Sequence, residues 1–330
     1  QYTKGWQYAY QVQRASFDKT LADACEQMGV PVQYETEVTN VVIHDDGSST
    51  TEVKHTDQST STIDARFIID GSGYGRVLPT LFGLNKPSTQ YPRKAVFAHM
   101  KDPHRLETDE PDRITIYVHN LNTWIWVIPF ADGTTSVGFV GSADFFEQYQ
   151  GSLTDQFKQM LHSEPDLKTR FRHFELLWDE PRVLQGWSAT TTTFYGKGFV
   201  LTGNVTEFLD PVFSSGVTLA TVSAQKAANL VVRQLKGEGV DWQKEYMDYM
   251  QTGVDVFRTF VNGWYDGTLF KIFFAKNPDE DLLNKICSVL AGYVWDESNP
   301  FVAKSEKTVY TLAKYLDAQQ ETAQDKKEVV

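Results

Sequence analysis

The sequence predicts an α/β fold in which a nucleotide-binding domain is interrupted by an antiparallel sheet. A pattern of short apolar strands and helices occupies the first part of the chain and returns after residue 189. Between these parts lie closely spaced strands separated by turn signals, which is typical of an antiparallel sheet. Helical periodicity with many aromatic residues follows over 242–316. Alternating strands and helices are typical of a sheet covered by helices.

The composition is that of a folded, acidic protein. Its 330 residues suit two domains of about 150 residues each. The net charge of −12 disfavours a general nucleic-acid binder. Cys25 and Cys287 form no CxxC pair and the histidines lack metal-binding spacing, so we expect no disulfide framework and no metal site. The sequence has no apolar run of 18 residues and no signal-peptide pattern, which predicts a cytoplasmic protein without a membrane span.

In the first part of the chain, residues 6–12 alternate aromatic and polar side chains and are predicted to form a strand. An apolar stripe at helical spacing follows Ser16 and predicts a helix that ends at Gly29. Three further strands are predicted, at residues 32–43, 52–55 and 63–69. The last strand leads directly into Asp70-Gly71-Ser72-Gly73, a small-residue loop suited to a nucleotide passing over the backbone.

The middle of the chain predicts strands at residues 95–100, 113–119, 123–129 and 135–140, with a hairpin turn at Asp132-Gly133. Within 124–129, Trp124, Trp126 and Ile128 share one face of the strand. The opposite face carries Ile125 and Val127, so we expect a strand buried on both sides. Core packing alone would also explain this pattern. A helix over 153–171 and a strand over 182–187 complete this part.

The returning β/α pattern contains the segment with the clearest chemistry. A buried strand over 198–202 ends at Gly203, and a loop then leads to Ser214-Ser215-Gly216 at the start of a long helix with a small-residue face. Helix amino termini present unpaired N–H groups that attract anions. An ordinary capped helix is the alternative interpretation. The polar tail over 317–330 is predicted to fray.

These segments together resemble the flavin-dependent halogenases, within the FAD-dependent monooxygenases of the para-hydroxybenzoate hydroxylase type. Residues 124–129 match the pattern WxWxIP, and 210–216 resemble the loop beside the flavin ring and halide. Arg14 with Phe17 and Asp18 resembles a helix start whose arginine approaches FAD. Residues 70–73 and 199–204 resemble the strand ends that contact this cofactor.

The resemblance implies an FAD/NAD(P)-binding Rossmann-like domain with an inserted sheet domain and a helical C-terminal region. The expected boundaries are 1–90 and 189–238 for the two parts of the FAD-binding domain, 91–188 for the antiparallel-sheet substrate domain and 239–330 for the helical region with its polar tail. The residues expected to bind FAD share positions with family motifs: Arg14, Asp70, Gly71, Ser72, Gly73, Gly203, Asn204, Asp210, Pro211, Ser214, Ser215, Gly216 and Val217. Ser215 and Gly216 are also the expected halide site, while Trp124, Trp126 and Pro129 are candidate walls of the route to substrate.

Three departures from the family pattern qualify this expectation. The N-terminal GxGxxG segment is absent, so the chain is expected to be the remainder of a longer protein, and the catalytic lysine of halogenases falls in the absent part. Asn204 replaces the family aspartate, which would weaken a hydrogen bond to the cofactor. Phe213 replaces the glutamate of tryptophan halogenases, which favours a phenol- or pyrrole-like substrate, carried by a carrier protein in some relatives.

The resemblance therefore implies an FAD-dependent oxidoreductase that acts on an aromatic small molecule through a flavin C4a-hydroperoxide. A flavin reductase, a carrier protein and halide are the implied partners. Halogenation, hydroxylation and reduction remain open, as does a non-catalytic, truncated remnant that binds an aromatic ligand.

Overall fold

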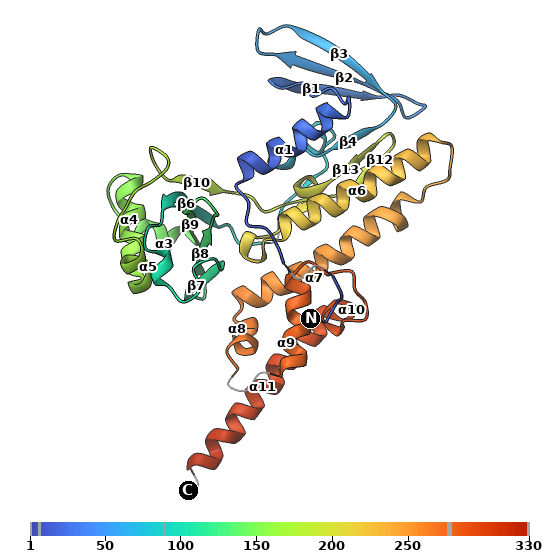
Figure 1. Cartoon of the computed structure of the whole chain (residues 1–330). Helices are drawn as coiled ribbons and strands as arrows, with labels where there is room; N and C mark the ends of the chain where they lie inside the picture. Colours follow the sequence, from blue (N-terminus) through green and yellow to red (C-terminus); the bar gives the residue numbers. More distant parts are fainter. Residues whose placement is uncertain (1, 6–7, 89, 276–278, 329–330) are drawn as a thin grey trace. The chain divides into compact units, whose positions relative to one another are not determined.

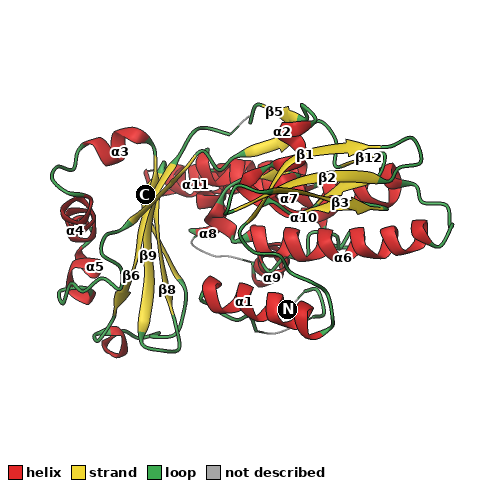
Figure 2. Cartoon of the chain, turned by 90° about the horizontal axis from the view of Figure 1, so that it is seen from above, coloured by secondary structure: helices red, strands yellow, loops and turns green. Residues whose placement is uncertain are grey.

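The structure is a computed structural model that describes residues 2–5, 8–88, 90–275 and 279–328. The chain divides into two compact units, whose elements are shown in Figures 1 and 2. The first unit contains Gln1–Gly5, Gln33–Gln90 and Trp187–Val330, and the second contains Trp6–Val32 and Tyr91–Gly186. Sheets and helices in both units confirm the predicted α/β class.

Three small sheets form the strand framework of the first unit. Strands β1 (Thr36–Ile43), β2 (Ser49–His55) and β3 (Thr60–Ala65) form an antiparallel meander. In the second sheet, β13 (Phe199–Leu201) pairs in parallel with β4 (Ile68–Asp70) and antiparallel with β12 (Tyr195–Gly196). The third sheet has the order β14 (Glu207–Phe208), β11 (Ala189–Thr191), β5 (Asn85–Lys86). The parallel pair brings the carboxyl ends of β4 and β13 to one edge.

Helices make up most of the rest of this unit. They are α2 (Val77–Leu81), α6 (Ser215–Leu235), α7 (Asp248–Tyr265), α8 (Thr268–Phe273), α9 (Glu280–Leu290), α10 (Pro300–Ala303) and α11 (Ser305–Glu328). Short 3₁₀ turns occupy Gly73–Gly75, Gly203–Val205 and Pro211–Phe213, and a π-helical turn, Gln243–Met247, precedes α7. A buried cluster joins β1, α2 and β13 through Val41, Leu78, Phe199, Leu201 and Val205.

The second unit is built on a five-stranded antiparallel sheet. Its order is β10 (Arg182–Gln185), β6 (Lys94–Lys101), β9 (Thr134–Gly141), β8 (Thr123–Pro129), β7 (Thr115–Asn120). The helices of this unit are α1 (Arg14–Gln27), α3 (Ala143–Glu147), α4 (Leu153–Ser163) and α5 (Pro165–Arg170), and a 3₁₀ turn lies at Arg105–Glu107. The core combines residues from one face of the sheet, such as Ile125, Val127 and Phe139, with Phe145 and Phe157 from the helices.

Most predicted elements are confirmed, including the helix near 16–29, the four central strands and the Asp132-Gly133 turn. Three predictions are wrong in extent. The predicted strand over 63–69 is two strands, because the chain leaves β2 after Ala65 and pairs with β13 from Ile68 onward. The predicted helix over 153–171 breaks before Pro165, which lacks the N–H needed inside a helix.

The predicted strand over 6–12 is also wrong in its described part, because residues 8–13 pair with no strand. Trp6 and Gln7 lie outside the described residues. Tyr8 and Tyr10 are 61% and 80% exposed, so both rings of the alternating pattern point away from a core. At the other end, α11 continues through Glu328 where fraying was predicted. Its Ala, Gln, Glu and Lys residues are good helix formers, which explains why polarity alone misleads here. No helix in the described ranges is both long and apolar enough to cross a membrane.

Candidate functional site

The carboxyl ends of β4 and β13 lie side by side in the first unit and place two predicted loops together. Asp70 is in register with Leu201, and the amide of Thr202 donates to the Asp70 carbonyl at 2.9 Å. A Cβ on Gly71 would lie 3.5 Å from Thr202 Oγ1, so the two chains are in van der Waals contact just beyond the strands. This edge is where ligands bind in open α/β sheets.

The side chains of Asp70 and Ser72 hold the first loop to α2. Asp70 is 6% exposed, and its Oδ1 and Oδ2 accept hydrogen bonds from the amides of Ser72 at 2.8 Å and Leu78 at 2.9 Å. Ser72 Oγ accepts from the amide of Val77 at 2.9 Å. These two side chains therefore shape the loop, and the backbone around Gly71 and Gly73 is the part with room for a ligand. Cofactor contact by these residues stays a prediction.

Arg76, which the sequence reasoning missed, joins the two loops. Its Nη2 donates to the Thr190 carbonyl at 2.9 Å, and its Nη1 donates to the carbonyls of Asn204 at 3.4 Å and Val205 at 3.3 Å. Burial lowers the pKa of this guanidinium, an effect that the charge of Asp70 opposes, but an arginine remains charged at neutral pH. No spacing in the sequence signals these contacts, because they join positions more than 100 residues apart.

Gly203 and Asn204 lie against the first turns of α6. The amide of Gly203 donates to Ser223 Oγ at 2.8 Å, and a Cβ on Gly203 would lie 3.1 Å from Ala220 Cβ. The small-residue face of the helix thus permits the close approach expected from the sequence. Asn204 Oδ1 lies 3.9 Å from the position that a Cβ on Gly216 would take. Within the described chain, the Asn204 side-chain amide forms no hydrogen bond.

Side chains of α7 hold the loop over residues 210–214, which precedes α6. Asp210 is 2% exposed; its Oδ1 accepts from the amide of Val212 at 3.0 Å, and its Oδ2 accepts from Tyr265 Oη at 3.0 Å. The ring of Phe213 packs edge-to-face against Phe260 and Trp264. These contacts show that Phe260 and Trp264, in the aromatic stretch near the C-terminus, pack against the loop.

Helix α6 itself begins without a side-chain cap. Ser214 precedes it in the left-handed conformation, with φ +52°, and forms no capping hydrogen bond. The first amides of the helix, on Ser215, Gly216 and Val217, therefore keep the donor capacity that a cap would have used. A Cβ on Gly216 would lie 3.2 Å from the Phe208 ring, so glycine fits closely here. The capped-helix alternative is thus wrong for the side chain of Ser214.

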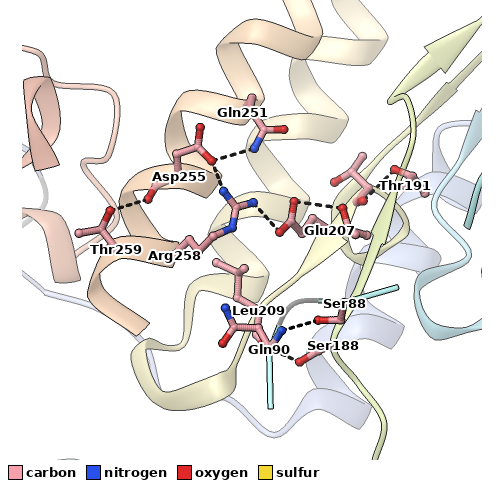
Figure 3. A network of polar contacts seen from close by, with 12 residues as sticks. Ser88, Gln90, Ser188, Thr191, Glu207, Leu209, Gln251, Asp255, Arg258 and Thr259 are labelled. Atoms are coloured by element: carbon pink, nitrogen blue, oxygen red, sulfur yellow. Dashed lines mark hydrogen bonds and ion pairs between the residues drawn. The ribbon is translucent and has the colours of Figure 1, made fainter. Parts of the chain in front are cut away.

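A polar network fixes the segment between Gly203 and Asp210 (Figure 3). Arg258 of α7 donates to Glu207 Oε1 at 2.5 Å and also pairs with Asp255. Ser188 Oγ donates to the Leu209 carbonyl at 2.8 Å. Because Glu207 and Arg258 are both largely buried, their pairing ties the loop to α7 and limits its movement.

In the second unit, the predicted Trp124, Trp126 and Pro129 lie on β8. The expectation of burial on both faces is confirmed for Ile125 and Val127 on one face and for Trp124 on the other. It is wrong for Trp126 and Ile128, which remain partly exposed. Helices α3 to α5 contribute to the core on the Ile125 face. The Trp126 indole lies across Gly138 of β9, and its Nε1 donates to Ser136 Oγ at 3.0 Å.

The tryptophans continue into a larger aromatic surface that sequence reasoning missed. We call it the aromatic face; its rings belong to Phe97, His99, Trp124, Trp126 and Trp178. Phe97 is 5.7 Å from Trp126 and 5.8 Å from Trp178, and His99 stacks on Trp178 at 4.5 Å between ring centroids. The alternation of β6, with Phe97 and His99 on the face opposite Val96 and Ala98, is the signal that could have revealed it.

Arg14, the remaining predicted cofactor residue, lies at the start of α1 in the second unit. It forms a two-point ion pair with Asp18, with both N–O distances 2.8 Å. The hydrogen bond from Arg14 lowers the pKa of Asp18. The guanidinium is 65% exposed, so contact with a cofactor stays a prediction.

Known proteins share both the sequence pattern and the fold. The family model described as tryptophan halogenase matches residues 1–311. The chain is 26% identical over 300 residues to the 1H-pyrrole-2-carbonyl peptidyl-carrier-protein brominase of Pseudoalteromonas luteoviolacea, covering 87% of this chain and 70% of that protein. It is 25% identical to the corresponding chlorinase of Pseudomonas fluorescens, covering 82% of this chain and 62% of the chlorinase.

A solved structure gives a higher similarity. The crystal structure of a flavoprotein/dehydrogenase from Cytophaga hutchinsonii has 49% sequence identity and a TM-score of 0.94, covering 97% of this chain and 78% of that one. The predicted Rossmann-like fold with a substrate-binding region is thereby confirmed, and so is the predicted family. The chain belongs to the tryptophan halogenase family of flavin-dependent, oxidoreductase-type enzymes.

Proposed function

We propose that the protein is an FAD-dependent enzyme that halogenates a phenol- or pyrrole-like substrate. The observation that carries this proposal is the meeting of three groups at one edge of the first unit: the glycine-rich ends of β4 and β13, the Asn204 amide without a partner in the described chain, and the uncapped start of α6. Family membership supplies the flavin chemistry.

The residues present fit a flavin. A flavin ring offers carbonyl oxygens and ring nitrogens along one edge, and the amides of Ser215 and Gly216 are matching donors. Asn204 can donate to a ribityl hydroxyl or accept from one. The close fit of Gly216 against Phe208 is consistent with a surface that a ligand approaches along the backbone. Bound FAD would supply oxygen activation after reduction.

The chain's own residues would orient the cofactor and the halide. The first turn of α6 would hold the halide or the pyrimidine edge of the flavin through its N–H groups and its positive dipole end. Asp210, with its carboxylate occupied by Val212 and Tyr265, would keep Pro211 in position rather than take part in proton transfer. In the second unit, Trp124, Trp126 and Pro129 stay candidates for the walls of the route to substrate.

The substrate and partners follow from the relatives. Both pyrrole-carrier enzymes are named for a substrate attached to a carrier protein, and Phe213 packs among aromatic rings. We propose an aromatic substrate, either free or attached to a carrier, together with a flavin reductase and a halide.

The test uses the full-length protein with FAD, a flavin reductase, NADH, oxygen and bromide. We expect brominated phenol or pyrrole products by mass spectrometry. Hydroxylated or reduced products without bromination would overturn halogenation and retain the flavoenzyme assignment. If the protein does not bind flavin, as measured by the quenching of flavin fluorescence, both the halogenase and the flavoenzyme assignments are overturned.

Asn204 provides a sharper test of the site. Asn204→Ala should weaken flavin binding about 5-fold, since one hydrogen bond is worth about 1 kcal/mol. Asn204→Asp should strengthen it by adding charge assistance. The matched control is Asn122→Ala, in an exposed turn of the second unit, which should leave the affinity unchanged. Equal affinities for all variants would contradict the assigned role of Asn204.

A further inference from the structure

A cationic side chain that has no carboxylate partner among the described residues lies at the edge of the aromatic face. Arg182 of β10 is directly opposite Phe97 of β6 in antiparallel register, so both side chains project from the same face of the sheet. The Arg182 guanidinium carbon lies 4.3 Å from the centroid of the Trp178 ring. Within the described ranges, no carboxylate forms an ion pair with Arg182.

Two other titratable side chains belong to the same face of β6. Lys101, two positions beyond His99 on β6, pairs with Glu175. Burial, followed by the charge of Arg182, lowers the pKa of His99, while Asp132 acts in the opposite direction. His99 therefore favours its neutral form, and Arg182 supplies positive charge to the face. An arginine without an ion pair in the part of the chain that the structure describes is unexpected in a chain with a net charge of −12.

Arg182 and Phe97 also stand side by side on neighbouring strands. Such strands are about 4.8 Å apart, so the two side chains can contact the same small ligand. Phe97 and Trp178 meet edge-to-face at 5.8 Å, an arrangement that presents one ring plane and one ring edge to a third ring. Arginine binds carboxylate and phosphate through two parallel N–H groups.

We propose that the aromatic face binds the aromatic ring of the substrate and that Arg182 binds an oxyanion carried by the same molecule. This inference rests on the proposed function, since it names the class of substrate for that enzyme. The oxyanion has two possible sources with the same chemistry: a carboxylate on a free aromatic acid, or the phosphate of a phosphopantetheine arm. Arg182 is thus a specificity-determining residue.

The experiment measures binding to the full-length protein by isothermal titration calorimetry without flavin or halide. The probes are 4-hydroxybenzoate, its neutral amide, and 4-hydroxybenzoyl thioesters of pantetheine and of phosphopantetheine. If the carboxylate is the oxyanion, the acid binds about 10-fold more tightly than the amide, and Arg182→Gln removes the difference. If the phosphate is the oxyanion, the phosphopantetheine thioester binds about 10-fold more tightly than the pantetheine thioester, and Arg182→Gln removes that difference.

Matched variants separate charge from structure. Arg113→Gln removes an exposed arginine of the same unit that pairs with Glu110, and it should leave every affinity unchanged. Arg182→Lys should retain part of the preference, because lysine keeps the charge but loses the two-point geometry. Phe97→Ala should weaken all probes together.

The proposal is overturned if neither the acid nor the phosphopantetheine thioester depends on Arg182. Flavin binding, measured separately, keeps the two proposals distinguishable. A protein that binds flavin but shows no Arg182-dependent preference refutes only this inference, whereas a protein that shows the preference but binds no flavin refutes only the proposed enzyme.

Discussion

Replacing Gly138 with alanine tests how the Trp126 indole is held. Gly138 is buried on β9, opposite Trp126 on one side and Phe97 on the other. An added Cβ would lie 2.2 Å from Trp126 Cζ2 and 2.4 Å from Cε2. Because these are ring atoms, the indole must rotate or the two strands must separate.

The expected cost follows from these contacts. Overpacking of a core costs about 1–3 kcal/mol. Rotation of the indole also breaks the 3.0 Å hydrogen bond from Nε1 to Ser136 Oγ, which is worth about 1 kcal/mol. The lower backbone entropy of alanine in the unfolded chain returns about 0.5–1 kcal/mol. We therefore expect Gly138→Ala to lower the free energy of unfolding by about 1–3.5 kcal/mol.

The assay is urea unfolding followed by circular dichroism, with near-ultraviolet spectra to report the tryptophan environment. Gly239→Ala is the control, since a Cβ there meets no atom within 4 Å and its φ is not left-handed; it should change stability by less than about 0.5 kcal/mol. In a Trp126→Ala background, Gly138→Ala should cost less than about 1 kcal/mol. An equal cost in both backgrounds would refute the proposed contact.

Two further predictions concern one residue in each unit. Asp70→Ala should destabilise the first unit by about 2–4 kcal/mol in urea unfolding, because two amides lose their acceptor. Exposed Asp45→Ala should be neutral, and equal effects of the two changes would contradict the assigned role of these hydrogen bonds. Burial and Arg182 lower the pKa of His99, so stability should fall as pH drops from 7 through the ordinary histidine pKa of about 6.5, because the unfolded chain then binds a proton that the folded chain resists. In urea unfolding, His99→Gln should make the midpoint depend less on pH. A pH dependence unchanged from wild type would refute the assigned role of His99.

Local patterns predict much of the fold because they report local forces. The alternation in 123–129 and the Asp132-Gly133 turn specify a hairpin through side-chain period and turn chemistry. Gly29 marks the end of α1 because it adopts φ +84°, where a side chain is strained. In contrast, Tyr8 and Tyr10 have an alternating pattern but no strand to pair with, and pairing is a property of the whole chain.

The candidate site divides in the same way. Gly203 and Gly216 could be proposed from sequence because a strand end and a helix start leave local signals, and Asn204 could be proposed from the family resemblance; all three stay predictions. Arg76 and Trp178 were missed because their partners, the Thr190 carbonyl and the rings of Phe97 and His99, are distant in sequence. The exposure of Trp126 was missed for a related reason: an apolar strand face looks the same in sequence whether it is covered completely or in part.

The contacts of Arg76 have a consequence for engineering members of this family. The side chain of Arg76, which follows β4, donates to backbone carbonyls of the turn after β13 and of β11. These three segments are therefore linked to one another although they lie far apart in the sequence. If residues 203–216 were replaced by those of a relative, Arg76 would face backbone carbonyls in different positions. Such loop exchanges should therefore give a folded protein only when residues 70–76 are exchanged together with residues 203–216.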